Sequence, residues 1–270
     1  MKIITLIENI VYKKGLKAEH GLSFLIKTPT MHILFDTGQT GEFMVNAQKM
    51  GEDLQSVDAV VLSHGHYDHA GGLQAFLDFN PHAKVYLKKE ALANKYSTST
   101  GDLHPIGIPF DVTPYIHRFC FVDDALELAP GIVVMGKIDR LVSYETDNNK
   151  LLVDHDNGFC PDPFDDELVM YLTHSEGLVV VSGCAHRGVV NTLQSIMAHA
   201  QTKLIRLFIG GTHLNGAPDH RLSATAQALW EMNITQMMPN HCTGIQAYGL
   251  LQEKMQAAVS YASTGTVVTI

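Results

Sequence analysis

Residues 60–72 read VVLSHGHYDHAGG, and four strong metal ligands fall within six positions of this stretch: His64, His66, Asp68 and His69. The apolar segment before them, residues 58–63 (DAVVLS), is typical of a buried strand, and residues 73–79 (LQAFLDF) are typical of a helix. Clustered imidazole and carboxylate groups lose solvation unless a positive charge lies between them. A divalent transition metal supplies that charge, and these ligand types suit zinc, iron, manganese or nickel. The stretch therefore predicts a metal site where a strand ends.

The composition is that of a globular protein. A chain of 270 residues with 46% hydrophobic content can bury a sizeable core, and we expect a single domain over residues 1–270. The formal net charge is 19 − 28 = −9, with no basic run, which argues against a nucleic-acid partner. The four cysteines form no CxxC pair and are expected to be reduced thiols of an intracellular protein: Cys120, Cys160, Cys184 and Cys242.

The N-terminal residues 1–15 (MKIITLIENIVYKKG) are typical of a first strand, because Glu8 and Asn9 interrupt the apolar run and no small-residue cleavage site follows. No apolar stretch approaches the length that spans a bilayer. We therefore expect a soluble, cytoplasmic protein without a membrane partner. The sequence does not indicate an oligomeric state.

The first half of the chain predicts strands at 2–7, 22–27, 31–35 and 84–87 and helices at 41–50 and 73–79. Asp36 follows a strand and precedes Thr37 and Gly38, which suits the active edge of an α/β sheet or a simple turn. Residues 94–118 show no helical or strand period, and a loop of this length is often the wall of a substrate site. The acidic residues 145–167 are expected to form a surface excursion with solvated charges.

The second half repeats one rhythm, in which an apolar strand leads to a glycine-containing turn that carries histidine. The predicted strands are 132–135, 168–173, 177–182, 204–209, 234–238 and 265–270, and the predicted helices are 189–200, 222–232 and 246–259. The three turns contain His186, His213 and His241. We predict an α/β fold with strands inside, helices outside and the histidines gathered at one edge.

These motifs resemble the metallo-β-lactamase superfamily over essentially the whole chain. HGHYDH matches the HxHxDH motif, LFDTG matches the early strand-to-Asp segment, and GCAHRG and NHCTG fall where the later histidines fall. With GGTHL, they are similar to the subgroup of dihydropterin-ribofuranosylaminobenzene-phosphate-synthase-like proteins. The resemblance implies an αββα sandwich of two mixed β-sheets packed face to face with helices outside. It also implies one metal held by His64, His66 and His186, and another held by Asp68, His69 and His241.

One position departs from the pattern of the superfamily. Its hydrolases often carry a bridging Asp at the end of the strand that here reads LFIGGTHL, where this chain has Gly210 and Gly211 and no carboxylate until Asp219. Water and substrate alone could then bridge two metals, the second site could be weak, or His213 could enter the coordination in its own way. His213 therefore stays open between a ligand, a substrate contact and a donor to a ligand.

Other residues near the predicted site edges are weaker candidates. Lys137 and Arg140 could hold an anionic substrate, although most such cations are merely solvated. Cys184 neighbours a ligand histidine and could contact the site, but a small buried hydrophobic role is the more ordinary one.

The leading functional hypothesis is a metal-dependent hydrolase that uses metal-activated water on a small ester, phosphoester or thioester, with Asp68 orienting the nucleophile. The ions are expected to be one or two zinc ions, with iron, manganese or nickel as alternatives. A second hypothesis is a phosphoribosyl- or pterin-type synthase that uses the same metal site. A third, of another class, is a metal- or ligand-binding sensor without turnover.

Overall fold

The computed structural model describes residues 1–145, 150–155 and 158–270. The chain forms two compact units. The first unit comprises residues 1–122, 148–166 and 263–270, and the second comprises residues 123–147 and 167–262. The α/β class predicted from the sequence is confirmed, since both units combine β-sheets with helices.

The first unit is built on a seven-stranded mixed sheet with the order β17-β1-β2-β3-β4-β5-β8. Strands β3, β4, β5 and β8 run parallel, so their carboxyl ends meet at one edge of the sheet. The short β4 is buried along its whole length, as expected for a strand covered on both faces. The strands are β1 (Lys2–Ile7), β2 (Ser23–Lys27), β3 (His32–Phe35), β4 (Ala59–Val61), β5 (Lys84–Leu87), β8 (Phe119–Phe121) and β17 (Val267–Thr269).

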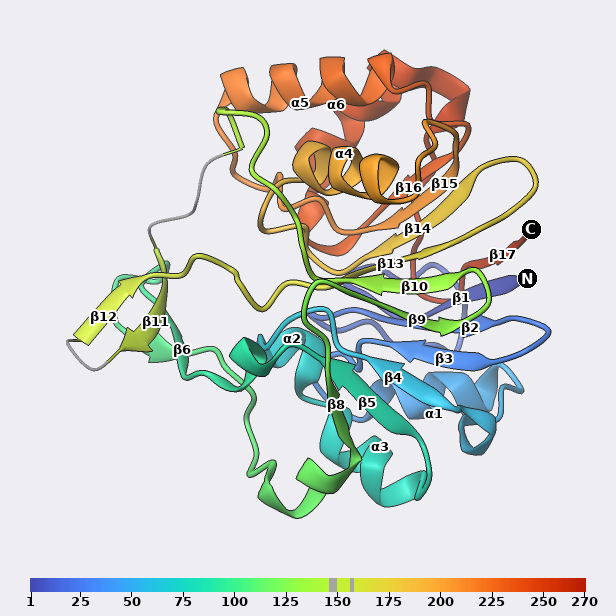
Figure 1. Ribbon diagram of the computed structural model, residues 1–270, viewed down its shortest axis with the longest axis vertical. Coiled ribbons are helices and arrows are strands. Elements are labelled where there is room, and N and C mark those ends of the chain that lie inside the picture. The colour runs from blue at the N-terminus through green and yellow to red at the C-terminus, as the bar shows by residue number, and fades with distance from the viewer. Residues whose placement is uncertain (146–149, 156–157) are drawn as a thin grey trace. The chain divides into compact units, whose positions relative to one another are not determined.

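Helices α1 (Glu42–Lys49) and α3 (Leu73–Phe79) lie beside β3, β4 and β5 in this unit (Figure 1). Their apolar faces join the strands in one core, to which Phe43 and Phe76 contribute fully buried rings. The four-residue α2 (Tyr67–Ala70) follows β4 directly. Three short 3-10 segments complete the unit: η1 (Leu54–Ser56), η2 (Lys89–Leu92) and η3 (Thr113–Arg118).

A second, four-stranded sheet in the first unit has the order β12-β11-β6-β7. It corrects the expectation that residues 94–118 lack strands. Strands of two or three residues are too short to show an alternating pattern, and β6 pairs with β11, which lies more than fifty residues further along. The strands are β6 (Lys95–Ser97), β7 (His104–Pro105), β11 (Leu151–His155) and β12 (Gly158–Pro161).

The expectation that the charges of residues 145–167 are solvated is wrong for four acidic residues. These four side chains are buried: Glu145, Asp162, Asp166 and Glu167. Each of them accepts hydrogen bonds from backbone or side-chain donors, which offset the loss of hydration. Residues 146–149 and 156–157 of this segment lie outside the described residues.

The second unit is built on a six-stranded mixed sheet with the order β16-β15-β14-β13-β10-β9. The hairpin predicted over 168–182 is confirmed by the antiparallel pairing of β13 with β14, while β14, β15 and β16 run parallel. The turns after these three parallel strands therefore leave the same edge of the sheet. The strands are β9 (Ala125–Ala129), β10 (Ile132–Met135), β13 (Val169–Leu172), β14 (Leu178–Ser182), β15 (Ile205–Gly210) and β16 (Met237–Pro239).

Three helices cover one face of this second sheet: α4 (Val189–His199), α5 (Asp219–Glu231) and α6 (Ile245–Met255) (Figure 1). The predicted helix over 246–259 ends earlier than expected, at Met255, and the 3-10 segments η4 (His241–Thr243) and η5 (Gln256–Ala258) flank α6. Leu193, Phe208 and Leu229 join helices and strands in one core. Among the residues that the structure describes, none of the helices combines the length and apolar character needed to cross a membrane.

Candidate metal centre

The turn after β4 brings its histidines together within the first unit. His64 and His69 are fully buried, and their ring centroids lie 4.3 Å apart. The Nε2 atom of His64 lies 3.0 Å from Nδ1 of His66. The sharp turn after β4 and the single-turn helix α2 thus bring the imidazoles of His64, His66 and His69 close together.

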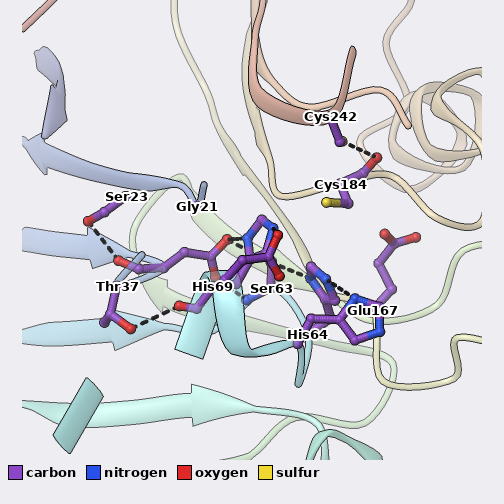
Figure 2. A network of polar contacts seen from close by, with 12 residues as sticks. Gly21, Ser23, Thr37, Ser63, His64, His69, Glu167, Cys184 and Cys242 are labelled. Atoms are coloured by element: carbon purple, nitrogen blue, oxygen red, sulfur yellow. Dashed lines mark hydrogen bonds and ion pairs between the residues drawn. The ribbon is translucent and has the colours of Figure 1, made fainter. Parts of the chain in front are cut away.

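Asp36, at the end of β3, holds this turn from the neighbouring strand. Its Oδ2 lies 2.7 Å from Nδ1 of His69, and its Oδ1 accepts the backbone N–H of Ser63 at 2.7 Å. Ser63 and Thr37 add hydroxyl contacts to Asp36 Oδ2 and the His69 carbonyl, respectively, and Ser23 donates to the Asp36 carbonyl (Figure 2). A carboxylate on one ring nitrogen fixes the tautomer so that the other nitrogen can bind a metal.

Asp36 also adopts an uncommon backbone conformation, with φ +57°. A left-handed conformation at a non-glycine residue costs free energy and persists only where its surroundings enforce it. Here the hydrogen bonds to Ser63 and His69 supply that constraint. The geometry fits an aspartate that orients a ligand histidine.

Asp68, the remaining ligand candidate of the turn, lies with a carboxylate oxygen 3.8 Å from Nε2 of His69. The same oxygen is 3.3 Å from Nε2 of His20, a half-exposed side chain that the sequence did not single out. Asp68 itself is largely buried. A buried carboxylate beside imidazoles is the donor set that a divalent transition metal takes.

A buried lysine supports the same turn. Lys95 on β6 forms ion pairs with Asp162 at 2.5 Å and Asp166 at 3.0 Å, and the other oxygen of Asp166 accepts the backbone N–H of Gly65 at 2.8 Å. Gly65 lies between His64 and His66 and packs against the carbonyl of Ala91 with no room for a side chain. The Lys95–Asp162–Asp166 group therefore fixes the ligand turn from a distant part of the sequence.

These surroundings set the protonation of His66. Burial, reinforced by the nearby Lys95 ammonium, lowers the pKa of His66 to about 3. The imidazole is therefore neutral at pH 7, which is the form that binds a metal. For Lys95, burial opposes the charge, but Asp166 and Asp162 raise its pKa above the ordinary value.

A cavity of about 620 Å³ opens beside the ligand turn in the first unit, and Tyr67 of the turn lines it. Lys95, Tyr96 and His104 contribute from β6 and β7, and residues 107–112 complete its wall. Of residues 94–118, the loop expected to form a substrate wall, 11 line this cavity, which is large enough for a small molecule.

In the second unit, His186, His213 and His241 follow the parallel strands β14, β15 and β16 and so share one edge of the sheet. The His186 and His213 rings lie 4.3 Å apart. His213, His241 and Ala185 all have positive φ, between +47° and +53°. Strained backbone thus gathers where the histidines leave the sheet.

Glu167 holds the turn that carries His186. Its two carboxylate oxygens accept the backbone N–H groups of His186 at 2.5 Å and Arg187 at 2.8 Å. Glu167 is 3% exposed, which explains why two charge-assisted hydrogen bonds are needed there. The sequence offered little signal for this role, because Glu167 ends an acidic run that is typical of solvated loops.

The second unit also places two thiols beside His213. The backbone N–H of His213 lies 3.2 Å from Sγ of Cys242, and Cys242 lies 3.6 Å from the carbonyl of Cys184 (Figure 2). Although burial opposes ionisation, contacts with Cys184 and His213 hold the pKa of the Cys242 thiol well below its usual range. None of the four cysteines, all of which the structure describes, forms a disulfide.

The remaining candidates from the sequence lie at the surface. Lys137 and Arg140, which follow β10, are exposed. The structure thus groups Asp36 with the ligand turn and Cys184 with His213. The residues that sequence reasoning missed are Lys95, Glu167 and His20, because none of them has a local pattern that distinguishes it from a surface charge.

The sequence profile of the metallo-β-lactamase superfamily matches residues 16–190, and the chain belongs to this superfamily. A curated relative from Methanocaldococcus jannaschii, 7,8-dihydropterin-6-methyl-4-(β-D-ribofuranosyl)-aminobenzene-5′-phosphate synthase, is 27% identical over 99% of this chain and 96% of its own length. A solved structure described as a metal-dependent hydrolase of the β-lactamase superfamily superposes with a TM-score of 0.86 at 29% identity, covering 100% of this chain and 99% of that one.

The zinc-bound PqqB of Methylobacterium extorquens shares 10% identity with a TM-score of 0.58 over the whole of both chains, a likeness that concerns the fold alone. The predicted superfamily and its resemblance to the synthase subgroup are thus confirmed. Members of this superfamily usually bind divalent metals, in agreement with the donor-rich turn seen here.

Proposed function

We propose that this chain is a metal-dependent hydrolase acting on a small, anionic ester, phosphoester or thioester. The observation that carries the proposal is the buried ligand turn: three imidazoles and a carboxylate share one spot in the first unit, and Asp36 orients one of the imidazoles. Burial of imidazoles and a carboxylate costs hydration free energy, which a cation bound between them would offset. The cavity lined by Tyr67 and Lys95 supports a small-molecule substrate.

The residues fit a divalent metal by the chemistry of their donors. We assign His64, His66, Asp68 and His69 as ligands on the first unit, and His186 and His241 on the second, following the family motifs that they match. The low pKa of His66 keeps its ring neutral and able to bind at physiological pH. Zinc is the ion that we propose, because its preferred ligands are imidazole nitrogen, carboxylate oxygen and thiolate sulfur.

When bound, such an ion supplies Lewis acidity that activates water and polarises a substrate oxygen. Asp68 orients the attacking water and accepts its proton, because its carboxylate lies beside His69 and His20, where a general base would act. Asp36 holds His69, and the Lys95–Asp162–Asp166 group holds Gly65, so that the turn keeps its geometry through the reaction.

The test is turnover of chromogenic carboxyl esters, phosphodiesters and thioesters by the wild-type protein and by Asp68→Ala. We expect the variant to lose at least a hundredfold in kcat while its circular dichroism stays native, a loss typical of removing a general base. Asp154→Ala, which changes an exposed aspartate, serves as the matched control. A folded Asp68→Ala variant with full activity would exclude this mechanism.

The second candidate function is a synthase that joins a phosphoribosyl- and a pterin-type fragment. The full-length similarity to the M. jannaschii synthase favours it. The two candidates differ in their products, because a synthase joins two fragments and a hydrolase releases two. Mass spectrometry of reactions with a phosphoribosyl donor plus a pterin-type acceptor, beside a simple phosphoester, separates them.

A further inference from the structure

Two thiols and one histidine of the second unit form a cluster of potential metal ligands. Cys184, His213 and Cys242 each offer one donor atom, and these three atoms lie within 4.8 Å of one another. Tetrahedral zinc with two sulfur ligands places the sulfurs roughly 3.8 Å apart. The three donors therefore need side-chain shifts of only about an ångström to bind one ion.

His213 has a ring nitrogen, Nδ1, that is buried and lacks a hydrogen-bond partner among the described residues. A buried ring nitrogen without a partner costs free energy, which a bound cation would recover. The left-handed backbone of His213, with φ +47°, is a further cost that a binding function would account for.

The absence of a side chain at Gly211 leaves room for the Cys242 sulfur. A Cβ atom at residue 211 would lie 2.5 Å from Sγ of Cys242 and 2.5 Å from the carbonyl oxygen of Gly183. The backbone oxygen cannot move aside easily, so no side chain fits there. The superfamily pattern expects a bridging aspartate at this position. In this chain the residue is Gly211, and the Cys242 sulfur occupies the space that a side chain would take.

We propose that Cys184, His213 and Cys242 form a thiolate-containing metal site that takes a zinc ion. Two sulfurs and one nitrogen select borderline-soft ions and leave a fourth position open for water or a substrate group. The site goes beyond the proposed hydrolase centre, because none of its three residues is a ligand in that assignment.

The experiment loads the metal-depleted wild-type protein with Co²⁺ or Cd²⁺ and records the near-ultraviolet sulfur-to-metal charge-transfer absorption. We expect a band that Cys242→Ser and Cys184→Ser each weaken at least twofold and the double variant abolishes. Zinc content by mass spectrometry should fall in parallel. Cys120→Ser and Cys160→Ser are the matched controls, because these free thiols lie in the first unit, and both should keep the band.

The His66→Ala variant separates this proposal from the proposed function. It should lose activity and metal from the ligand turn yet keep the charge-transfer band. If the cysteine variants fail to fold, X-ray absorption of zinc-loaded wild-type protein answers the same question through sulfur scattering at about 2.3 Å. A spectrum with nitrogen and oxygen scattering alone, a band that survives in the double variant, or a disulfide between Cys184 and Cys242 would each overturn the proposal.

Discussion

Single carboxylates decide how the candidate metal ligands point. Asp36 contacts His69 and Ser63, and Glu167 contacts the backbone of His186 and Arg187. Both acids are buried, so their hydrogen bonds act in a medium of low dielectric and hold their partners firmly. These residues shape the ligands although we do not assign either of them as a ligand.

Replacing Asp36 tests this role. Asp36→Asn keeps the size of the side chain and tolerates the left-handed backbone, but it removes the charge beside His69. We expect metal affinity to fall by about 10- to 100-fold while the fold survives, as is typical for partners of ligand histidines. Competition with a chromophoric chelator measures the affinity, and Asp154→Asn is the control. Unchanged affinity would show that His69 does not need Asp36.

Lys95→Met is expected to destabilise the protein by about 3–5 kcal/mol, because it leaves the buried carboxylates of Asp162 and Asp166 without a counter-charge. Urea unfolding measures the change. The triple variant Lys95→Met/Asp162→Asn/Asp166→Asn should recover much of the loss, since no uncompensated charge remains. If the triple variant is no more stable than Lys95→Met, the cost lies in packing and not in charge.

The ion pairs of Lys95 with Asp162 and Asp166 predict an upper pH limit for the contribution of Lys95 to stability. The folded-state pKa of Lys95 lies above its ordinary value of 10.5, so its contribution to stability is complete below that pH and is lost as pH rises through the folded pKa. On the alkaline side, the difference in stability between wild type and Lys95→Met should therefore narrow only above about pH 10.5. If Lys95 lost its charge, and with it this difference in stability, below pH 7, the raised pKa of Lys95 would be wrong.

In both units, the candidate site residues follow the carboxyl ends of parallel strands. In the first unit, Asp36 follows β3 and the ligand turn follows β4; in the second, the three histidine turns follow β14, β15 and β16. Parallel strands direct their carboxyl ends to one edge, so residues far apart in sequence gather there. The helices that follow these turns anchor them in the core.

Helix α4 offers a prediction at this scale. Its first residue follows Gly188, which cannot cap the helix with a side chain, and Glu145 instead accepts the N–H groups of Val190 and Asn191 at 2.9 Å each. Glu145→Ala should cost about 1–2 kcal/mol by chemical denaturation, as for loss of a helix cap. Glu145→Gln should cost less, because an acceptor remains and a buried charge is removed. Equal losses for both variants would contradict the capping role.

Much of this architecture could be predicted from the sequence. Strand β1 and helix α3 match the predicted residues one for one, because long periodic segments carry their own signal. The ligand turn was visible because its polar residues are adjacent in sequence. Lys95 could not be found in this way, since its partners lie 67 and 71 residues away and no local pattern marks a buried ion pair.

At the scale of the whole molecule, metal binding should raise the free energy of unfolding. An ion that binds only the folded chain stabilises it by about 2.7 kcal/mol at a hundred times its dissociation constant. Chelation should then lower the thermal midpoint by roughly 5–10 °C for a protein of this size. Calorimetry with and without a chelator measures this, and restoring the ion should restore the midpoint.

Metal content of the purified protein tests the central claim most directly. The comparison is between wild type, His66→Ala and His82→Ala, in which His82 is an exposed histidine away from the ligand turn. We predict that wild type and His82→Ala carry at least one equivalent of a divalent transition metal per chain, while His66→Ala loses at least one equivalent relative to them. A wild-type protein that is metal-free and takes up no zinc after reconstitution would contradict the account.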